Sequence, residues 1–507
     1  MNINDAKTQV KNTVVAYLAR DDMGMFRVPP EQQRPIFLIG APGIGKTAIM
    51  SQIANELDIG LVSYSMTHHT RQSALGLPFI VHREFDGKSF DVSEYTMSEI
   101  IASIYDYIEK TGLSSGILFL DEINCVSETL YPSMLQFLQF KMFGRHKVPD
   151  NWIIVCAGNP AEYNRSVHEF DIVTLDRLRK IEVEPDLEAW KAYARTTNVH
   201  PAIMSFLDVK SDKFYSVEST PEGMRFVSAR GWSDLSGVMT MYEELDYPID
   251  KRLIVQYVQD DEIAELFALY YDLFKKYQSD YQVSNILDGT APEEIASRAR
   301  AAQFDERLAL LSMIIDGISA KTTEALERAN TLISMRDMLR EAKPALLEGA
   351  SLESTLVPKV DELEKELKRR LASEVSSSQR IRLQRLVISQ TKALIAQCEL
   401  QNAEGGQKAF EIMQGEYQQS VLGLDPFIDD ASKAIDNAFA FIEKVFGDDR
   451  EMLVFVTELT ARSTISGFIS RFGSDSYYAH NDELMVDRNK DSLIGEIEEL
   501  SGEYRKR

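Results

Sequence analysis

The chain has 507 residues and a formal net charge of −24 at pH 7, with 44% hydrophobic and 26% charged residues. This length predicts two to four domains, each large enough to bury a core. The strong negative charge disfavours general binding to nucleic acid or to an anionic membrane, because both repel an acidic protein. We therefore expect neither as a partner.

The cysteine content and the N-terminus indicate a cytoplasmic protein. Cys125, Cys156 and Cys398 are the three cysteines and show no CxxC spacing, which argues against a disulfide framework and fits a reducing compartment. Residues 1–22 lack the apolar segment of a secretion signal. No uncharged apolar stretch approaches about 18 residues, so we expect no membrane span.

Three regions follow one another along the chain. Residues 1–185 alternate apolar runs with helical patterns, which predicts an α/β domain with a parallel sheet covered on both faces. The apolar runs are residues 35–40, 59–65, 116–122, 151–159 and 180–183. Residues 186–275 and 276–507 show mostly helical patterns, and the second of these regions is expected to be entirely α-helical. Two apolar stripes within it predict a long helical hairpin over residues 355–404.

The segment "GAPGIGKT" carries the first chemical pattern. It matches G-x-x-x-x-G-K-[ST] in full and lies between an apolar run and a helical pattern, as this motif requires. Its residues are Gly40, Ala41, Pro42, Gly43, Ile44, Gly45, Lys46 and Thr47. The glycines let backbone N–H groups surround phosphate oxygens, Lys46 can neutralise the β- and γ-phosphates, and Thr47 can bind Mg²⁺. The segment predicts an ATP site; the alternative is a glycine turn that binds nothing.

Two further apolar runs end in polar residues. "ILFLDEIN" (117–124) leads to Asp121 and Glu122 at the carboxyl end of a predicted strand, where sites of parallel sheets lie. Asp121 would hold the Mg²⁺ shell, and Glu122 would orient and deprotonate the attacking water. "IIVCAGNP" (153–160) ends at Asn159, which would contact that water or the γ-phosphate. In the simpler interpretation, Asp121 and Glu122 only cap a helix and Asn159 only starts a turn.

Three arginines complete the set of candidates. Arg177 and Arg179 lie in "LDRLRK" (175–180), and Arg230 lies in "SARG". Surface arginines are usually solvated, so the residue type alone assigns no role to any of them.

Together these motifs resemble the AAA+ ATPases, and within them the MoxR-type family, over about residues 5–275. Gly40–Thr47 matches Walker A and "ILFLDE" matches Walker B. The continuation "DEIN" is similar to the MoxR-type "DEINR", with Cys125 in place of the arginine.

The resemblance extends to the polar residues after Walker B. Asn159 matches sensor 1, and Arg230 in "SARG" is similar to the sensor 2 arginine of "SPRA". Arg177 in "LDRL" resembles the arginine finger of "LDRF", with Leu178 in place of phenylalanine. Arg179 remains a rival for the finger.

The resemblance implies a five-stranded α/β nucleotide domain over residues 1–185 and a helical lid over residues 186–275. It also implies a homo-oligomeric, usually hexameric ring, with ATP bound between neighbouring subunits. Glu122, Asn159, Arg177 and Arg230 would then form the catalytic set. Such ATPases remodel protein clients and are often encoded beside proteins with a von Willebrand factor A domain, so we expect such a partner.

The segment "HHTRQSALG" (68–76) begins with the paired histidines His68 and His69. By resemblance it occupies the place of a channel-facing or inter-subunit loop, and residues 79–96 that of a small β insertion in helix 2. A zinc site with His82, direct catalysis and an ordinary structural loop are the other interpretations.

An alternative function is a nucleic-acid-linked NTPase motor. The GTPase subunits of modification-dependent restriction systems share this branch of AAA+, and "NPAEYNRS" (159–166) faintly resembles their "NTADRS" element. The acidic composition and the lack of a basic segment with interleaved aromatic residues argue against it. A scaffold that does not hydrolyse ATP is disfavoured by Glu122.

Overall fold

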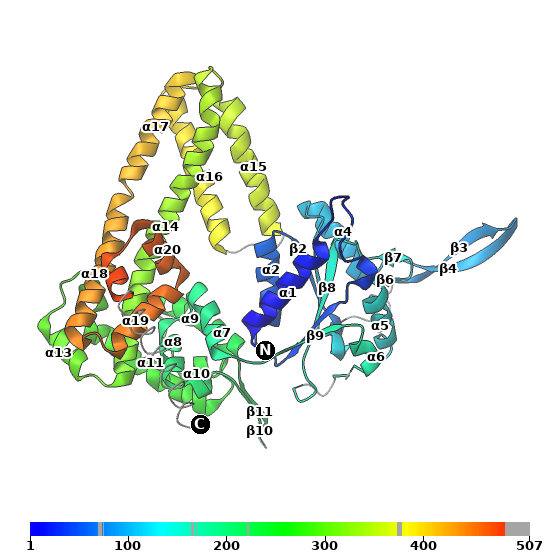
Figure 1. Cartoon of the computed structure of the whole chain (residues 1–507), viewed down its shortest axis with the longest axis horizontal. Coiled ribbons are helices and arrows are strands. Elements are labelled where there is room, and N and C mark those ends of the chain that lie inside the picture. The colour runs from blue at the N-terminus through cyan, green and yellow to red at the C-terminus, as the bar shows by residue number, and fades with distance from the viewer. Residues whose placement is uncertain are drawn as a thin grey trace, which may run out of the picture. The chain divides into compact units, whose positions relative to one another are not determined.

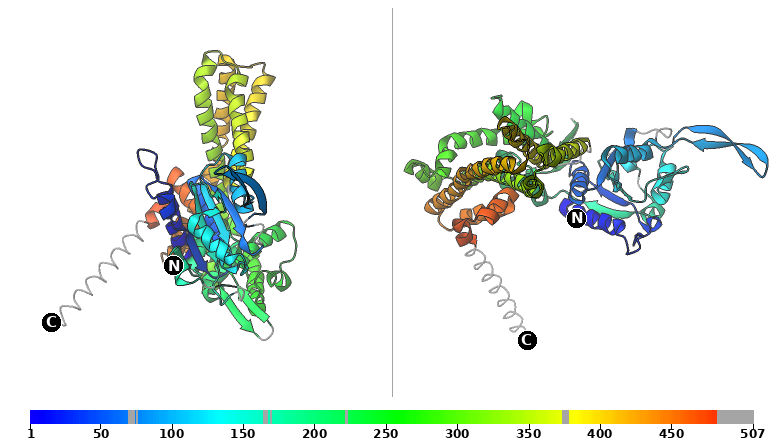
Figure 2. Two further views of the ribbon diagram at one scale, coloured as in Figure 1. Left: turned by 90° about the vertical axis from the view of Figure 1, so that its right-hand side faces the viewer. Right: turned by 90° about the horizontal axis from the view of Figure 1, so that it is seen from above.

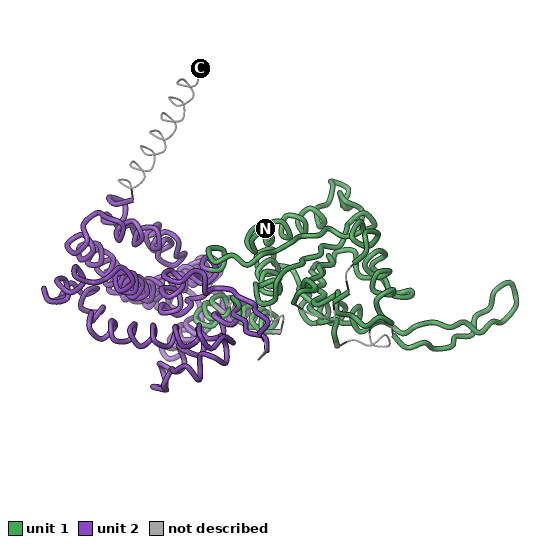
Figure 3. The backbone as a smooth tube through the Cα atoms, turned by 90° about the horizontal axis from the view of Figure 1, so that it is seen from below, with its two compact units in different colours: residues 1–190, 228–230, 360–388 green, residues 191–227, 231–359, 389–507 purple. Residues whose placement is uncertain are grey.

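The computed structural model describes residues 1–68, 74, 76–163, 167, 168, 170–220, 223–372 and 378–481. The chain divides into two compact units (Figure 3). Unit 1 comprises residues 1–190, 228–230 and 360–388, and unit 2 comprises residues 191–227, 231–359 and 389–507. The domain boundaries expected near residues 185 and 275 stay predictions. His69 and most of the loop that follows it lie outside the described residues.

Unit 1 contains a five-stranded parallel sheet in the order β2-β5-β8-β1-β9. Its strands are β1 (Ile36–Gly40), β2 (Gly60–Ser65), β5 (Gly116–Asp121), β8 (Trp152–Gly158) and β9 (Arg179–Val183). They coincide with the five apolar runs, within a residue at the edges. This sheet and the large helical region after it confirm the predicted fold class.

Helices cover both faces of this sheet, as the apolar runs require (Figure 1). Along the strands, Leu118 and Ile154 point to the face covered by α4 and α5, where they pack with Ile104 and Phe137. On the other face, α2 packs against β5, and α1 packs against α2. The helices of unit 1 are α1 (Ile3–Leu18), α2 (Lys46–Leu57), α4 (Glu99–Thr111), α5 (Tyr131–Phe140) and α6 (Ile172–Leu175), with short 3₁₀ turns at Pro30–Gln32, Met66–His68 and Ile123–Cys125.

A β-hairpin interrupts the chain between β2 and α4. It consists of β3 (Pro78–Phe85) and β4 (Lys88–Tyr95), paired antiparallel, and it extends from the body of unit 1 as a two-stranded ribbon (Figure 2). This is where the resemblance places a small β insertion. A second, very short hairpin joins β6 (Met142–Phe143) to β7 (His146–Lys147).

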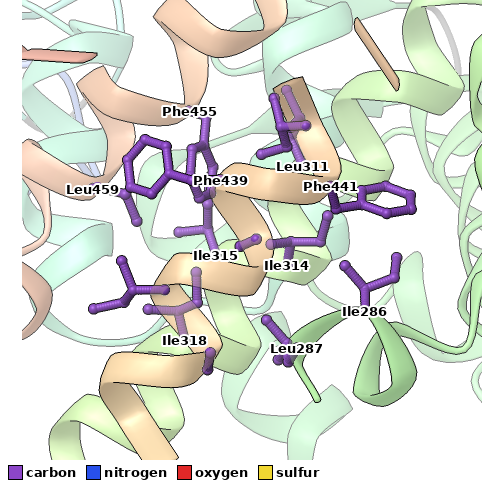
Figure 4. Packing of buried hydrophobic residues seen from close by; sticks show 14 of the residues in the cluster. Ile286, Leu287, Leu311, Ile314, Ile315, Ile318, Phe439, Phe441, Phe455 and Leu459 are labelled. Atoms are coloured by element: carbon purple, nitrogen blue, oxygen red, sulfur yellow. The ribbon is translucent and has the colours of Figure 1, made fainter. Parts of the chain in front are cut away.

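Unit 2 is helical apart from one hairpin, β10 (Ser216–Thr220) and β11 (Gly223–Val227). In one of its hydrophobic cores, Ile314 and Ile318 of α14 pack with Phe439, Phe455 and Leu459 (Figure 4). The first helices are α7 (Leu187–Thr196), α8 (Pro201–Val209), α9 (Ala229–Glu244), α10 (Lys251–Ile254), α11 (Asp261–Tyr281), α12 (Val283–Leu287) and α13 (Glu293–Ala301), with a 3₁₀ turn at Ser211–Lys213. The later helices are α14 (Phe304–Leu347), α15 (Leu352–Ala372), α16 (Ser378–Leu400), α17 (Gly406–Leu422), α18 (Asp425–Phe446), α19 (Arg450–Ala461) and α20 (Ser463–Phe472). α7 and α9 begin within unit 1, and the C-terminal part of α15 and the N-terminal part of α16 belong to it.

The described part of residues 355–404 forms α15 and α16. Leu356 and Cys398 on these helices are fully buried, so both helices contribute to a core. Backbone hydrogen bonds join the chain before α15 to the chain after α16: Gly406 N donates to Ala350 O at 3.0 Å, and Leu352 N donates to Glu404 O at 2.8 Å. The two ends of the segment are therefore fixed to each other and to the surrounding structure.

No single helix in the described part of the chain is long and apolar enough to cross a membrane. Taken together, α19 and α20 are long and apolar enough for a membrane span by length and composition only, and the two helices meet at a bend of 86°.

Trp152 packs against two glycines at the amino ends of neighbouring strands, and this close packing predicts an effect on stability. Gly60, Gly116 and Trp152 are aligned as the first residues of β2, β5 and β8. A Cβ on Gly116 would lie 2.7 Å from the Trp152 ring and 2.8 Å from Gly60 O. We expect Gly116→Ala to destabilise the fold by about 1–3 kcal/mol through overpacking.

The measurement is the thermal unfolding midpoint followed by circular dichroism, with Gly237→Ala as the matched control. A Cβ on Gly237 within α9 meets no atom within 4 Å, so this change should be neutral or stabilise by up to about 1 kcal/mol. A Gly116→Ala protein that unfolds at the parental midpoint would contradict the packing argument.

Candidate active site

The segment Gly40–Thr47 connects β1 to α2 as one tight turn. Gly40 is the last residue of β1 and α2 begins at Lys46. Gly43 has φ 72°, and a Cβ there would lie 2.8 Å from the Ser228 side chain, so both backbone conformation and space favour glycine. Ala41 and Ile44 are buried and support the turn, whereas Pro42 is exposed.

Lys46 is the buried cation of the site. Its Nζ donates hydrogen bonds to Gly40 O and Ala41 O, both at 2.8 Å, and to Asn159 Oδ1 at 3.0 Å. Burial lowers the pKa of Lys46 to about 8, and the nearby Asp121 carboxylate opposes that shift. The contact with Asn159 brings the predicted phosphate-binding lysine and the predicted sensor together.

Thr47 and Asp121 present two oxygen ligands side by side. Thr47 Oγ1 donates to Asp121 Oδ2 at 3.0 Å, and Asp121 Oδ1 accepts from Glu122 N at 2.9 Å. Hard oxygen donors in this number suit Mg²⁺, which is commonly held by one or two protein oxygens together with phosphates and waters. These two residues would therefore hold the metal, and the metal would supply charge neutralisation for the phosphates.

Glu122 is fixed by two hydroxyl groups that the sequence analysis missed. Its Oε2 accepts hydrogen bonds from Ser65 Oγ at 3.0 Å and from Thr67 Oγ1 at 3.1 Å. Its backbone has φ 55°, which is uncommon outside glycine and often marks functional positions. The sequence carried no signal for these contacts, because they depend on the pairing of β2 with β5, in which Ser65 aligns with Asp121.

The three arginines occupy different environments. Arg230 lies in the first turn of α9, and its backbone N donates a hydrogen bond to Gly43 O at 3.0 Å. The charge of its guanidinium lowers the pKa of Lys46 further. The guanidinium of Arg179 donates hydrogen bonds to two side chains of α1 in its own unit, the Thr13 hydroxyl and Gln9 Oε1, the second at 2.8 Å. Arg177 is exposed, and within the described residues no hydrogen bond joins its side chain to the site. The structure thus gathers Lys46, Thr47, Asp121, Glu122, Asn159 and Arg230, and leaves Arg177 outside.

Comparison with known families and structures gives the domain's identity. Residues 36–175 match the model of the ATPase family associated with various cellular activities (AAA). The chain carries an AAA ATPase domain. This domain makes the protein an ATP hydrolase.

Comparisons with solved structures and with curated proteins add less to the identity of the AAA ATPase domain. A solved structure from Cytophaga hutchinsonii ATCC 33406, described as a "putative ATPase", is similar with 12% identity and a TM-score of 0.24. The match covers 50% of this chain and 85% of that chain. No curated protein matches the sequence. Membership of the MoxR-type family and the roles of individual residues in the AAA ATPase domain stay predictions.

Glu122→Gln should separate nucleotide binding from hydrolysis. The amide keeps the shape of the side chain but cannot take a proton from water, so we expect ATP binding near the parental affinity and a loss of turnover of at least about 100-fold. Phosphate release and binding of a fluorescent ATP analogue measure the two effects. Lys46→Ala is the control and should lose binding itself. Parental turnover by Glu122→Gln would show that another group is the base.

The lowered pKa of Lys46 predicts a pH dependence of ATP binding. With a pKa of about 8, Lys46 of the free protein is mostly a cation below pH 8 and mostly neutral above it. Above pH 8, binding of phosphate therefore requires uptake of a proton by Lys46. We expect the apparent ATP affinity to fall by up to about tenfold per pH unit above pH 8. Titration calorimetry between pH 7 and 9.5 measures it.

Lys141 offers a matched control for that titration. Burial also lowers its pKa to about 8, but its Nζ bonds Gln33 Oε1 and not the site. Lys141→Met should keep the pH dependence of ATP affinity. An affinity that stays constant across this range would contradict the assignment of Lys46.

Proposed function

We propose that this AAA ATPase works as a ring of identical subunits, six in number as the resemblance implies. In this ring, Arg177 of one subunit completes the ATP site of its neighbour. The observation that supports this is the position of Arg177, which is exposed while the other candidates gather around Lys46. Arg179 is the weaker candidate for the finger, because it is bonded to α1 of its own chain.

The proposed chemistry distributes roles over these residues. Lys46 and the backbone N–H groups of the turn bind the phosphates, with Mg²⁺ held by Thr47 and Asp121. Glu122 takes a proton from the attacking water, while Asn159 orients the water or the γ-phosphate. An arginine supplied by a neighbour stabilises charge on the transferred group and contributes about 10³–10⁵ in rate in related NTPases.

We further propose a protein client, remodelled or assembled in the manner of MoxR-type ATPases, with a von Willebrand factor A domain protein as partner. The net charge of −24 disfavours nucleic acid. The β3–β4 hairpin carries large exposed apolar side chains suited to protein contact, namely Phe79, Ile80, Phe85 and Phe90. The loop of residues 68–76 would line the ring's channel, and the 355–404 hairpin would project from the ring as a docking arm for the protein partner.

Mixed rings test the shared site. Arg177→Ala should bind ATP near the parental affinity and lose hydrolysis, and Lys46→Ala should lose both. Mixing the two should restore part of the ATPase activity, because some interfaces then combine an intact Lys46 with an intact Arg177. A protein that stays monomeric at every concentration and hydrolyses ATP normally would overturn the ring.

Arg179→Ala is the matched control for Arg177→Ala. It removes bonds to Thr13 and Gln9, so it should lower stability by about 0.5–3 kcal/mol and leave most of the ATPase activity. Loss of hydrolysis in Arg179→Ala with normal hydrolysis in Arg177→Ala would transfer the finger to Arg179. Strong stimulation of ATPase activity by DNA would favour the nucleic-acid motor instead.

A further inference from the structure

Asn124 lies two residues after Glu122, in the 3₁₀ turn that follows β5, and its side chain is almost fully buried, with 2% exposed. Its Nδ2 donates a hydrogen bond to the backbone carbonyl of Asn159 at 2.8 Å. Its own backbone O accepts from His168 N at 2.8 Å. One side chain therefore joins the turn after β5 to the end of β8.

Gly158 makes room for this contact. A Cβ on Gly158 would lie 2.4 Å from Asn124 Oδ1, so the amide lies directly against the Gly158 backbone. The opposite orientation of the amide would set Oδ1 against the Asn159 carbonyl, two acceptors facing each other, so Nδ2 must be the atom that bonds it. Oδ1 has no hydrogen-bond partner among the described residues, and the amide's one strong bond is the one to Asn159.

The bond acts on a residue of the site. Asn159 Oδ1 accepts from Lys46 Nζ at 3.0 Å, and the position of that side chain depends on the backbone that Asn124 holds. On the other side, Cys125 N donates to Glu122 O at 2.9 Å, which closes the turn that carries both Glu122 and Asn124. The base candidate and the sensor candidate are thus connected through one buried amide.

We infer that Asn124 is a positioning residue for ATP hydrolysis, which holds Asn159 at a fixed distance from Glu122 by bonding the Asn159 backbone. This inference rests on the proposed role of Asn159. It assigns Asn124 no contact with ATP or water. A displacement of about 1 Å in a reacting group can cost about 100-fold in rate, which is the size of effect that a positioning residue can exert.

The test is a double-mutant cycle on the full chain. Asn124→Ala should lower kcat by about 10- to 100-fold and change the affinity for a fluorescent ATP analogue less than about threefold. In an Asn159→Ala background, the same change should lower kcat by less than about twofold, because the sensor that it positions is already absent. Additive effects on kcat would overturn the route through Asn159.

Asn437 gives a matched control for the loss of a partly buried bond from a side-chain amide to a backbone carbonyl. Its Nδ2 donates to Leu287 O at 2.8 Å in unit 2, the same type of bond in a place without a candidate site. Asn437→Ala should lower the thermal midpoint and leave kcat unchanged. Equal losses of kcat in Asn437→Ala and Asn124→Ala would show that general destabilisation is the cause and would overturn the inference.

Asn124→Asp keeps the test usable if Asn124→Ala does not fold. Aspartate has nearly the same size but puts a carboxylate oxygen where Nδ2 donates, so kcat should fall at least as far as in the alanine variant. Parental kcat in a folded Asn124→Asp protein would overturn the inference. Parental kcat in Asn159→Ala alone would overturn the sensor assignment, which is a separate outcome from failure of the ring.

Discussion

Parallel pairing of the central strands is the constraint on which the site depends. Because β1, β5 and β8 run in the same direction, their carboxyl ends meet at one edge of the sheet. Gly40, Asp121 and Gly158 end these strands, and Lys46, Glu122 and Asn159 follow within a few residues. A sheet with one of these strands reversed would keep every motif and lose the site.

The site combines a buried cation with acceptors that partly compensate its burial. Loss of hydration favours the neutral amine of Lys46, and the carboxylates of Asp121 and Glu122 favour the ammonium. The loss of hydration is the larger effect, so the pKa lies below its ordinary value. A bound phosphate would supply the negative charge that the buried ammonium needs as a partner. The burial that lowers the pKa of Lys46 in the free protein therefore favours binding of an anion.

In unit 2, contacts join residues on both sides of position 275. Helix α14 packs against α8 and α11, and the guanidinium of Arg195 on α7 bonds Glu458 of α19 through Nη2 at 2.5 Å. Both side chains are largely shielded from water, so breaking the pair would leave a poorly hydrated charge. Helical periodicity predicts the helices of this region but carries no information about which of them pack together.

The sequence alone determined the elements and the chemistry that lies within short segments. The five apolar runs predict the five strands, and the phosphate-binding turn is recognisable because its glycines, lysine and threonine are consecutive. Tertiary structure decided what depends on residues far apart in the chain: the bonds of Ser65 and Thr67 to Glu122, the bond of Asn124 to Asn159, and the different surroundings of Arg177 and Arg179. A motif records residues that the backbone already holds close together, whereas these contacts exist only once the parallel strands have aligned.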